Sequence, residues 1–399
     1  MRPFLFFGLW LWPLLLLAGP LRPPRLHPDP ETARQTYRRN LTDWRGQYAN
    51  RRDLPDSHFF LFGMGNRRKL IYQAGKITDA QTGEVLHRWP VKTEVVVPSE
   101  YLVHLITTDG QTIQLREDEQ AVWLLQPGTG IKPTALTVGP ISLPAFGRHP
   151  FGPVLRVLHH EILINVIAGK PVPNFLVYAR PWYRDATLMA MVLKQTGNLA
   201  LIRDWILALR DPFDRNNHGI SEADNPGQVL YLLSLVADKR HPAVAIALDS
   251  VRQFITGDHI AGKTDYAQHP VFQTKWLKYG LQSLGLPDPY RIPAVYDSYS
   301  SLFWWAFREQ HVPGKQFDRD LNTNYPYLLW AEDHFFGQHQ GMTGNLDYPL
   351  SWEQRASDAR YVGMAVVNPD LVSQKLSYPH TWHTAEMFLF LTDTNPRLR

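Results

Sequence analysis

Acidic and aromatic side chains occur together at five points where the sequence pattern indicates that a loop ends and a helix begins. Tryptophan and tyrosine rings stack on the faces of sugars, and carboxylates either bind sugar hydroxyls or transfer protons. At any single junction, a helix cap or a first-turn charge is the simpler explanation of the acid. Capping does not require bulky aromatic neighbours, so the repeated pairing favours a carbohydrate site. The junctions are residues 180–185, 222–228, 296–300, 348–354 and 378–383.

Asp297 is the candidate general acid. Hydrolysis of a glycosidic bond with inversion needs an acid and a base about 6.5–9.5 Å apart, on opposite sides of the bond. The acid must stay protonated near neutral pH, which requires an apolar or anionic setting. Tyr296 and Tyr299 flank Asp297, and three further aromatic residues follow at positions 303–305. This neighbourhood is of the required kind.

Two other carboxylates are candidates for proton transfer. Glu353 follows Trp352 and is the candidate base that activates a water molecule. A first-turn glutamate that complements the helix dipole explains Glu353 equally well. Asp333 stands beside Glu332, and adjacent carboxylates raise each other's pKa when both are confined. The alternative for this pair is a solvated helix face.

Arg184 and Asp185 are candidates for holding the substrate rather than for proton transfer. A guanidinium fork beside a carboxylate can grip two neighbouring hydroxyls and fix the orientation of a sugar ring. The remaining binding candidates combine ring faces with hydrogen-bonding groups at the same junctions. They are Trp182, Tyr183, Asp224, Gln228, Tyr296, Trp352, Trp382 and His383.

Metal-binding patterns are weak, and neither a metal nor a cofactor is predicted. The chain has no cysteine, which excludes disulfides, thiolate metal sites and cysteine nucleophiles. His380, His383 and Glu386 have i, i+3, i+6 spacing, which does not turn all three side chains toward one ion on a regular helix. Residues 214–219 resemble a fragment of a calcium loop but lack its bidentate glutamate, so a turn is expected.

The elements that must position these residues change character near residue 150. Short runs rich in β-branched and aromatic residues fill residues 59–143 and predict a small antiparallel sheet or sandwich. From residue 152 onward, apolar residues recur at helical spacing in about ten segments. Successive helical hairpins predict a mainly α fold, an (α/α)6 toroid preceded by the β domain. The expected boundaries are 1–30 for a leader and linker, 57–145 for the β domain and 150–399 for the toroid.

A resemblance to a known superfamily points the same way. Residues 182–187, Trp-Tyr-Arg-Asp-Ala-Thr, resemble a helix entry of six-hairpin, glucoamylase-like glycosidases. The resemblance implies that Arg184 and Asp185 hold the sugar next to the bond that is cleaved. Residues 224–228 are similar to the next inner-helix entry, and residues 381–389 to the last hairpin. Asp297 stands where those families place a glutamate pair, so this chain departs from their pattern at the proton donor.

The first residues predict export. Met1 and Arg2 precede a mostly apolar run over residues 4–18, as in a secretory signal peptide. The run is short for a membrane span, which needs roughly 20 residues. Because no clear cleavage site follows, an uncleaved anchor in the cell membrane is the alternative. Both interpretations place the bulk of the chain outside the cytoplasm, and five prolines within residues 20–30 predict a linker.

The expected function is hydrolysis of a cell-envelope or environmental glycan by an exported, inverting enzyme. The partner is an oligo- or polysaccharide, since a net charge of +4 over 399 residues is too small to predict nucleic-acid binding. A glycan-binding envelope protein without catalysis is one alternative. A polysaccharide lyase is the other, with a tyrosine or histidine as base and an arginine that neutralises the uronate. Its candidates are Tyr183, Arg184, Tyr299, His380 and His383.

Overall fold

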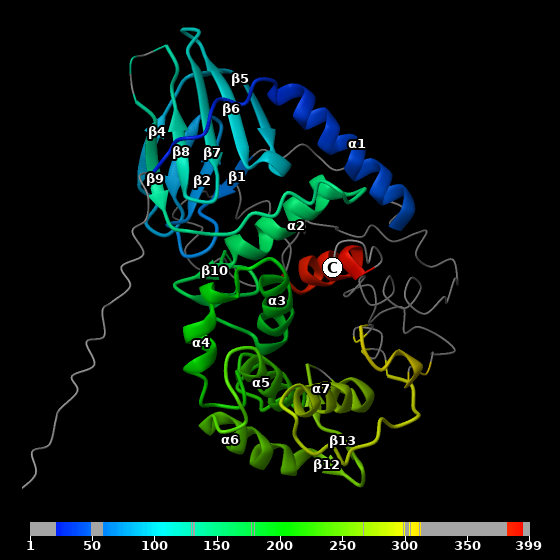
Figure 1. The fold of residues 1–399 in the computed structure, drawn as a ribbon. Coiled ribbons are helices and arrows are strands. Elements are labelled where there is room, and N and C mark those ends of the chain that lie inside the picture. Colours follow the sequence, from blue (N-terminus) through cyan, green and yellow to red (C-terminus); the bar gives the residue numbers. More distant parts are fainter. Residues whose placement is uncertain are drawn as a thin grey trace, which may run out of the picture.

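The computed structural model describes residues 21–48, 59–312 and 381–393, apart from positions 129, 131, 177, 179, 266, 298, 300–302, 304 and 311. Within these residues the chain forms eight α-helices and fifteen strands, and the strands pair in five antiparallel sheets. Figure 1 shows the N-terminal β region at one end of the molecule and most of the helices below it. The fold class is therefore α+β.

The predicted (α/α)6 toroid is wrong, and the resemblance to glucoamylase-like glycosidases does not hold for the fold. Six helical hairpins need twelve helices, whereas the described part of the chain has eight. One of these, α1 (Pro30–Tyr48), packs against β5 and α2. Three short β-hairpins also separate the later helices. Apolar spacing reports that one face of a helix is buried but not which element covers it, so the pattern could not distinguish the two folds.

The N-terminal strands form two antiparallel meanders. The first has four strands, and the second has five with the short helix η1 (Pro98–Glu100) between its first two. Apolar residues of both sheets and of α1 and α2 share one core. The strands are β1 (Phe59–Phe62), β2 (Leu70–Gln73), β3 (Lys76–Asp79), β4 (Val85–Arg88), β5 (Val91–Val97), β6 (Leu102–Thr107), β7 (Thr112–Glu117), β8 (Ala121–Leu125) and β9 (Thr134–Val138).

A buried ion pair holds the loop between β1 and β2 against the end of β7, and the same loop contacts α2. The Arg67 guanidinium donates to Glu117 at 2.8 Å, and both side chains are fully buried. Glu117 also accepts the backbone N–H of Gly63 at 2.9 Å. In the same loop, the N–H of Gly65 donates to the carbonyl of Leu163 in α2 at 2.9 Å. The loop therefore couples the β region to the first helix of the helical part.

The proline-rich segment that we predicted as a linker lies along β7 from residue 21 onward. Gln114 exchanges two hydrogen bonds with the backbone of His27, at 2.8 and 3.1 Å, and Arg116 donates to the carbonyl of Arg25 at 2.9 Å. Residues 1–20 lie outside the described residues, so export stays a prediction from the sequence. Among the helices that the structure describes, none combines the length and the apolar character needed to cross a membrane.

The helical part brings its C-terminal helix back onto its first helices. Thr381–Asp393 (α12, red in Figure 1) packs on α2 and α3, and α5 packs on α7. This arrangement gathers the start of α3, the start of α5, the face of α7 and the start of α12. The elements are α2 (Gly152–Ile164), β10 (Val166–Ile167), β11 (Lys170–Pro171), α3 (Tyr183–Gln195), η2 (Leu199–Leu201), α4 (Arg203–Leu207), α5 (Asn225–Ser234), α6 (Pro242–Val251), η3 (Arg252–Phe254), β12 (Ile255–Thr256), β13 (His259–Ile260), β14 (Lys263–Thr264), β15 (Ala267–Gln268), α7 (Pro270–Ser283), η5 (Arg308–Gln310) and α12.

Candidate functional site

Arg184, in the first turn of α3, is surrounded by three carboxylates. Its two terminal nitrogens donate to the two oxygens of Asp265, both at 2.7 Å, in a fork geometry. One of them also donates to Glu222 at 3.2 Å, and Nε lies 3.7 Å from Asp224. The Arg184 side chain is only 3% exposed. We call these four residues the Arg184 cluster.

Asp265 lies in the turn of the hairpin β14–β15, which places it in the cluster. Two residues connect the paired residues Thr264 and Ala267, and Asp265 is the first of them, with φ of +51°. Such a left-handed conformation is usual in two-residue hairpin turns, and aspartate tolerates it better than most residues. Its N–H donates to Glu222, and its carbonyl accepts from Asn217 at 3.3 Å. Backbone and side chain of Asp265 are thus both fixed.

Asp224 is fully buried behind Arg184 and connects the cluster to α7. It accepts from Thr264 Oγ1 and from Gln228 Nε2, each at 2.8 Å. Thr264 in turn accepts from Gln273 of α7 at 2.8 Å. Burial, opposed by the attraction of Arg184, raises the pKa of Asp224 to about 7. A carboxyl with this pKa exchanges a proton near neutral pH.

Asp265 differs from Asp224 in its ionisation. Burial alone would raise its pKa, but the Arg184 guanidinium and the Tyr299 hydroxyl stabilise the carboxylate more, so the pKa of Asp265 lies below its usual value. The site therefore holds one carboxylate that its neighbours keep ionised and one carboxyl group whose protonated form is favoured by burial. Environments that push the pKa values of neighbouring carboxyl groups apart are typical of acid–base sites.

A second group of buried side chains supports Tyr299. The Tyr299 hydroxyl donates to Asp265 Oδ2 at 2.8 Å. Its ring stacks on His269, with 3.8 Å between the ring centroids and 7° between the planes. Asp297 lies 2.9 Å from His269 Nδ1 and accepts the N–H groups of Tyr299 and Phe272, also at 2.9 Å. Asp297, our candidate acid, is thus buried in a supporting position, and its role in proton transfer stays a prediction.

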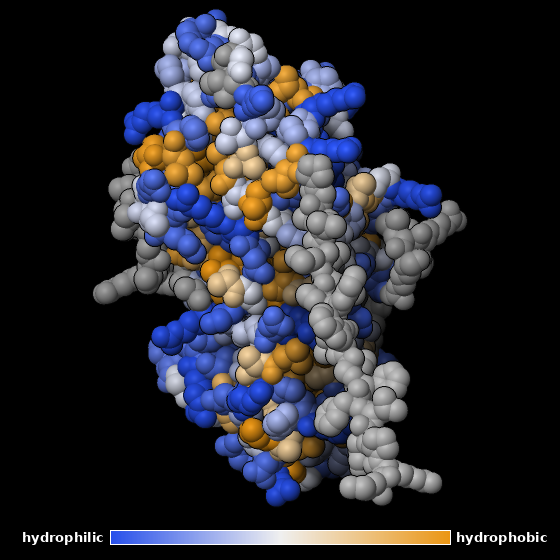
Figure 2. All heavy atoms as spheres, turned by 60° about the vertical axis from the view of Figure 1, so that its left-hand side comes forward, coloured by the Kyte–Doolittle hydropathy of each residue, from blue (hydrophilic) through white to orange (hydrophobic). Residues whose placement is uncertain are grey.

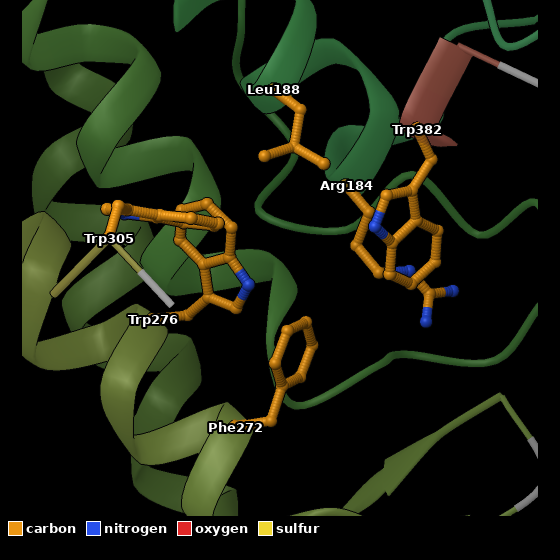
Figure 3. A pocket seen from close by; sticks show the side chains of 6 residues that line it. All are labelled: Arg184, Leu188, Phe272, Trp276, Trp305 and Trp382. Carbon is orange, nitrogen blue, oxygen red and sulfur yellow. The ribbon is translucent and has the colours of Figure 1, made fainter. Parts of the chain in front are cut away.

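An aromatic pocket adjoins the cluster (Figure 3). It is a narrow space, too small to hold a water molecule, between side chains of α3, α7 and α12 and one tryptophan beyond α7. Arg184 is its one charged lining residue among those the structure describes, and the guanidinium carbon lies 5.4 Å from the centre of the Trp382 ring. Figure 3 shows Trp276 and Trp305 on the side opposite Trp382 and Arg184. The lining residues are Arg184, Leu188, Phe272, Trp276, Trp305 and Trp382.

The start of α12 packs against α3 beside the site. The Thr381 hydroxyl donates to the buried carboxylate of Asp185 at 3.2 Å, and the Thr381 N–H donates to the carbonyl of Pro173 at 3.0 Å. Further along α12, the Glu386 side chain is buried. Burial raises the pKa of Glu386 well above its usual value, although a hydrogen bond with Trp382 opposes the shift. Burial therefore favours the protonated, uncharged form of Glu386 in the folded protein.

The substitution Glu386→Gln is expected to remove a pH dependence of stability. Because the folded-state pKa of Glu386 is raised, the unfolded state releases this proton first, and stability falls as the pH rises above the usual carboxyl value of 4.5. Glutamine cannot ionise, so the variant should gain stability relative to the wild type between pH 5 and pH 8. Urea unfolding at both pH values measures the difference. A gain that is the same at pH 5 and pH 8 would contradict the assignment.

The structure brings several of the predicted residues together. Arg184, Asp224, Gln228 and Trp382 meet in or beside the cluster, and Asp185 joins them through Thr381. The other predicted residues lie elsewhere: Trp182 packs edge-on against Tyr178, Tyr183 donates its hydroxyl to the carbonyl of Asp211, and Tyr296 is 40% exposed. Glu353, Asp333, Trp352 and the side chain of His383 lie outside the described residues.

Three residues of the site were not predicted. Glu222 stands two residues before Asp224 in the same junction, but only Asp224 was predicted there as an acidic site residue. Asp265 comes from a hairpin only two residues long on each side, and an aspartate in a turn is ordinarily read as a turn former. His269 precedes a proline at the start of α7 and resembles a cap. A pair of turn signals around residues 257–266 was the available clue to the hairpins.

The chemistry available at the site comes from carboxyl groups, one guanidinium and aromatic rings. In the part of the chain that the structure describes, no three acidic or histidine side chains are arranged to hold a metal ion. At residues 214–219 the Asp214 carboxylate accepts the N–H groups of Tyr183 and Asn216, at 2.7 and 2.9 Å, as a turn and helix start would require. The chain matches no known protein-family model, no curated protein and no solved structure.

Proposed function

We propose that this chain binds a neutral carbohydrate at the Arg184 cluster and hydrolyses a glycosidic bond there with carboxyl groups. One observation carries the proposal: Arg184 belongs at once to a cluster of three carboxylates and to an aromatic pocket. Rings that stack on a sugar and carboxyl groups that bind its hydroxyls or move protons are the two components of such a site. The proposal rests on this geometry and not on the fold.

The ionisation of the cluster supports acid–base chemistry. Hydrolysis of a glycosidic bond needs one carboxyl group to donate a proton and one carboxylate to act as base or nucleophile. Asp265, with a lowered pKa, supplies the carboxylate, and its side chain is the one of the three acids that reaches solvent. Burying four charged groups costs free energy. A role in a reaction explains why the protein has them in its interior.

The lyase alternative is disfavoured by the surroundings of Arg184. A lyase uses a free positive charge to neutralise the carboxylate of a uronate, but three carboxylates already surround this guanidinium. One positive and three negative formal charges leave the cluster with an excess of negative charge even when Asp224 is protonated. A uronate would be repelled, so a neutral glycan fits better.

The substitution Trp382→Ala tests the proposal. The wild-type protein is expected to release reducing sugar from at least one neutral α- or β-linked glucan or mannan oligosaccharide. Removing the ring beside Arg184 should raise the KM by roughly tenfold, since aromatic contacts of this kind are worth about 1 kcal/mol or more. Circular dichroism and the melting temperature check that the variant folds.

Trp89→Ala is the matched control. Trp89 stacks on His87 in the β region, with 5.3 Å between ring centroids. Its removal should leave the KM unchanged. An equal loss in both variants would show that the effect of Trp382 is not local to the pocket and would refute the assignment of the site.

A further inference from the structure

We propose that Asp265 is the reacting carboxylate of this site and that Tyr299 is the residue that positions it. The proposal rests on the proposed function, because it names the group that does the chemistry there.

Asp265 is the carboxylate of the cluster that a ligand can reach. Its side chain is 17% exposed, whereas those of Glu222 and Asp224 are 1% and 0% exposed. A general base or nucleophile must approach the reacting atom, and among the three acids Asp265 meets this requirement.

The direction of the Asp265 carboxylate is fixed by two different groups. Arg184 contacts both oxygens, and Tyr299 adds a hydrogen bond to Oδ2 at 2.8 Å. The turn conformation, with φ of +51°, is one that a non-glycine residue adopts at a cost, and such conformations persist where the surroundings hold them. Here Glu222 and Asn217 hold the backbone of Asp265. These contacts fix the carboxylate while its side chain stays 17% exposed.

Tyr299 can act as a positioning residue because its own freedom is removed. Its ring lies flat on His269, and its N–H donates to Asp297, which also binds the His269 ring and the start of α7 through Phe272. Trp382 meets the ring from a third side, edge-on at 6.1 Å between centroids. The Tyr299 side chain is therefore held in one orientation, with its hydroxyl donating to Asp265, as a preorganised hydrogen-bond donor requires.

The charged and titratable groups that face Asp265 come from every neighbouring element. Loss of the Tyr299 hydroxyl removes one donor to the carboxylate and leaves the others in place, so the pKa of Asp265 should rise without loss of the ion pair. The groups that face Asp265 are Arg184 from α3, Glu222 and Asp224 from the start of α5, His269 from the start of α7, and Tyr299.

The test compares Tyr299→Phe with Tyr279→Phe. Phenylalanine keeps the ring that stacks on His269 and removes only the hydroxyl. Tyr279, in α7, packs on the Tyr231 ring at 5.0 Å between centroids and serves as the matched control. Full-length protein labelled with ¹³C at the aspartate carboxyl carbons is titrated by NMR, and Asp265→Asn identifies the Asp265 signal. The midpoint for Asp265 should move to higher pH in Tyr299→Phe and stay unchanged in Tyr279→Phe.

The pH profile of kcat supplies the second readout. If Asp265 reacts as the ionised form, the acidic limb of kcat should move to higher pH in Tyr299→Phe by the same amount as the NMR midpoint. An unmoved midpoint with turnover intact overturns the positioning role of Tyr299. A moved midpoint with an unmoved acidic limb overturns the reacting role of Asp265. Turnover of no glycan at all overturns the proposed function, and the reacting role with it, whatever the titration shows.

Discussion

Replacing Arg184 with methionine is expected to lower the free energy of unfolding by about 3–5 kcal/mol at neutral pH. The guanidinium is the partner of three carboxylates, and two of these have side chains no more than 1% exposed. Without it, the carboxylates stay buried close together with no compensating charge. Low pH protonates them, so the loss of stability should shrink as the pH falls below about 5. Urea unfolding of wild type and variant at pH 7 and pH 4.5 measures both effects.

Arg240→Met is the control for this substitution. Arg240 also pairs with an aspartate, at 2.6 Å from Asp238, but its side chain is 87% exposed. Exposed ion pairs contribute little because water solvates both partners, so this variant should unfold nearly as the wild type does. A loss at Arg184 no larger than the loss at Arg240 would mean that the cluster is solvated, and the electrostatic account of the site would fail.

The second large effect is expected at the crossing of α5 and α7. A Cβ atom added to Gly280 would overlap the carbonyl oxygen of Gly227 and lie 2.8 Å from Leu230 Cβ. Because the first obstacle is backbone, the two helices must separate to accept it, so Gly280→Ala should cost about 3 kcal/mol. That cost exceeds the roughly 1 kcal/mol by which alanine favours a helix over glycine. Thermal unfolding followed by circular dichroism measures the net loss.

The same crossing positions the site, which gives the prediction a second readout. Gly227 lies one residue before Gln228, and α7 carries Phe272 and Trp276 of the pocket. Gly280→Ala should therefore also weaken carbohydrate binding. Gly147→Ala is the control, since a Cβ there would meet nothing within 4 Å and the residue has no left-handed φ. If Gly280→Ala were as stable as Gly147→Ala, the close helix contact would not exist.

The elements of this chain were predictable where their burial pattern was simple. Runs such as those of β1 and β8 are apolar throughout and are strands in the structure, and the helices α2, α5 and α7 follow their apolar spacing to within three residues at each end. In contrast, α1 was missed: its buried residues Tyr37, Leu41 and Trp44 do have helical spacing, but so few large apolar residues give a weak signal. Strands of mixed polarity such as β7 were missed for the same reason.

The arrangement of the helices was not predictable, and neither was half of the site. The local spacing of apolar residues indicates that one face of a helix is buried, but it does not indicate what covers that face. In the structure, α1 packs on β5, and α12 packs on α2, which lies more than 200 residues earlier in the chain. Arg184 and Asp224 could be proposed because each stands beside a helix start. Asp265 depends on a hairpin of two-residue strands, which leaves almost no periodic signal. A contact between residues 81 positions apart in the sequence is a property of the tertiary fold.

Turnover of oligosaccharides by the wild-type protein tests the central claim most directly. The protein is incubated with a panel of neutral α- and β-linked glucans and mannans and with a uronate polymer, and both reducing sugar and ultraviolet absorbance of unsaturated products are measured. The account predicts reducing sugar from at least one neutral glycan and no product from the uronate. Unsaturated products from the uronate, or neither turnover nor binding of any neutral glycan, would contradict it.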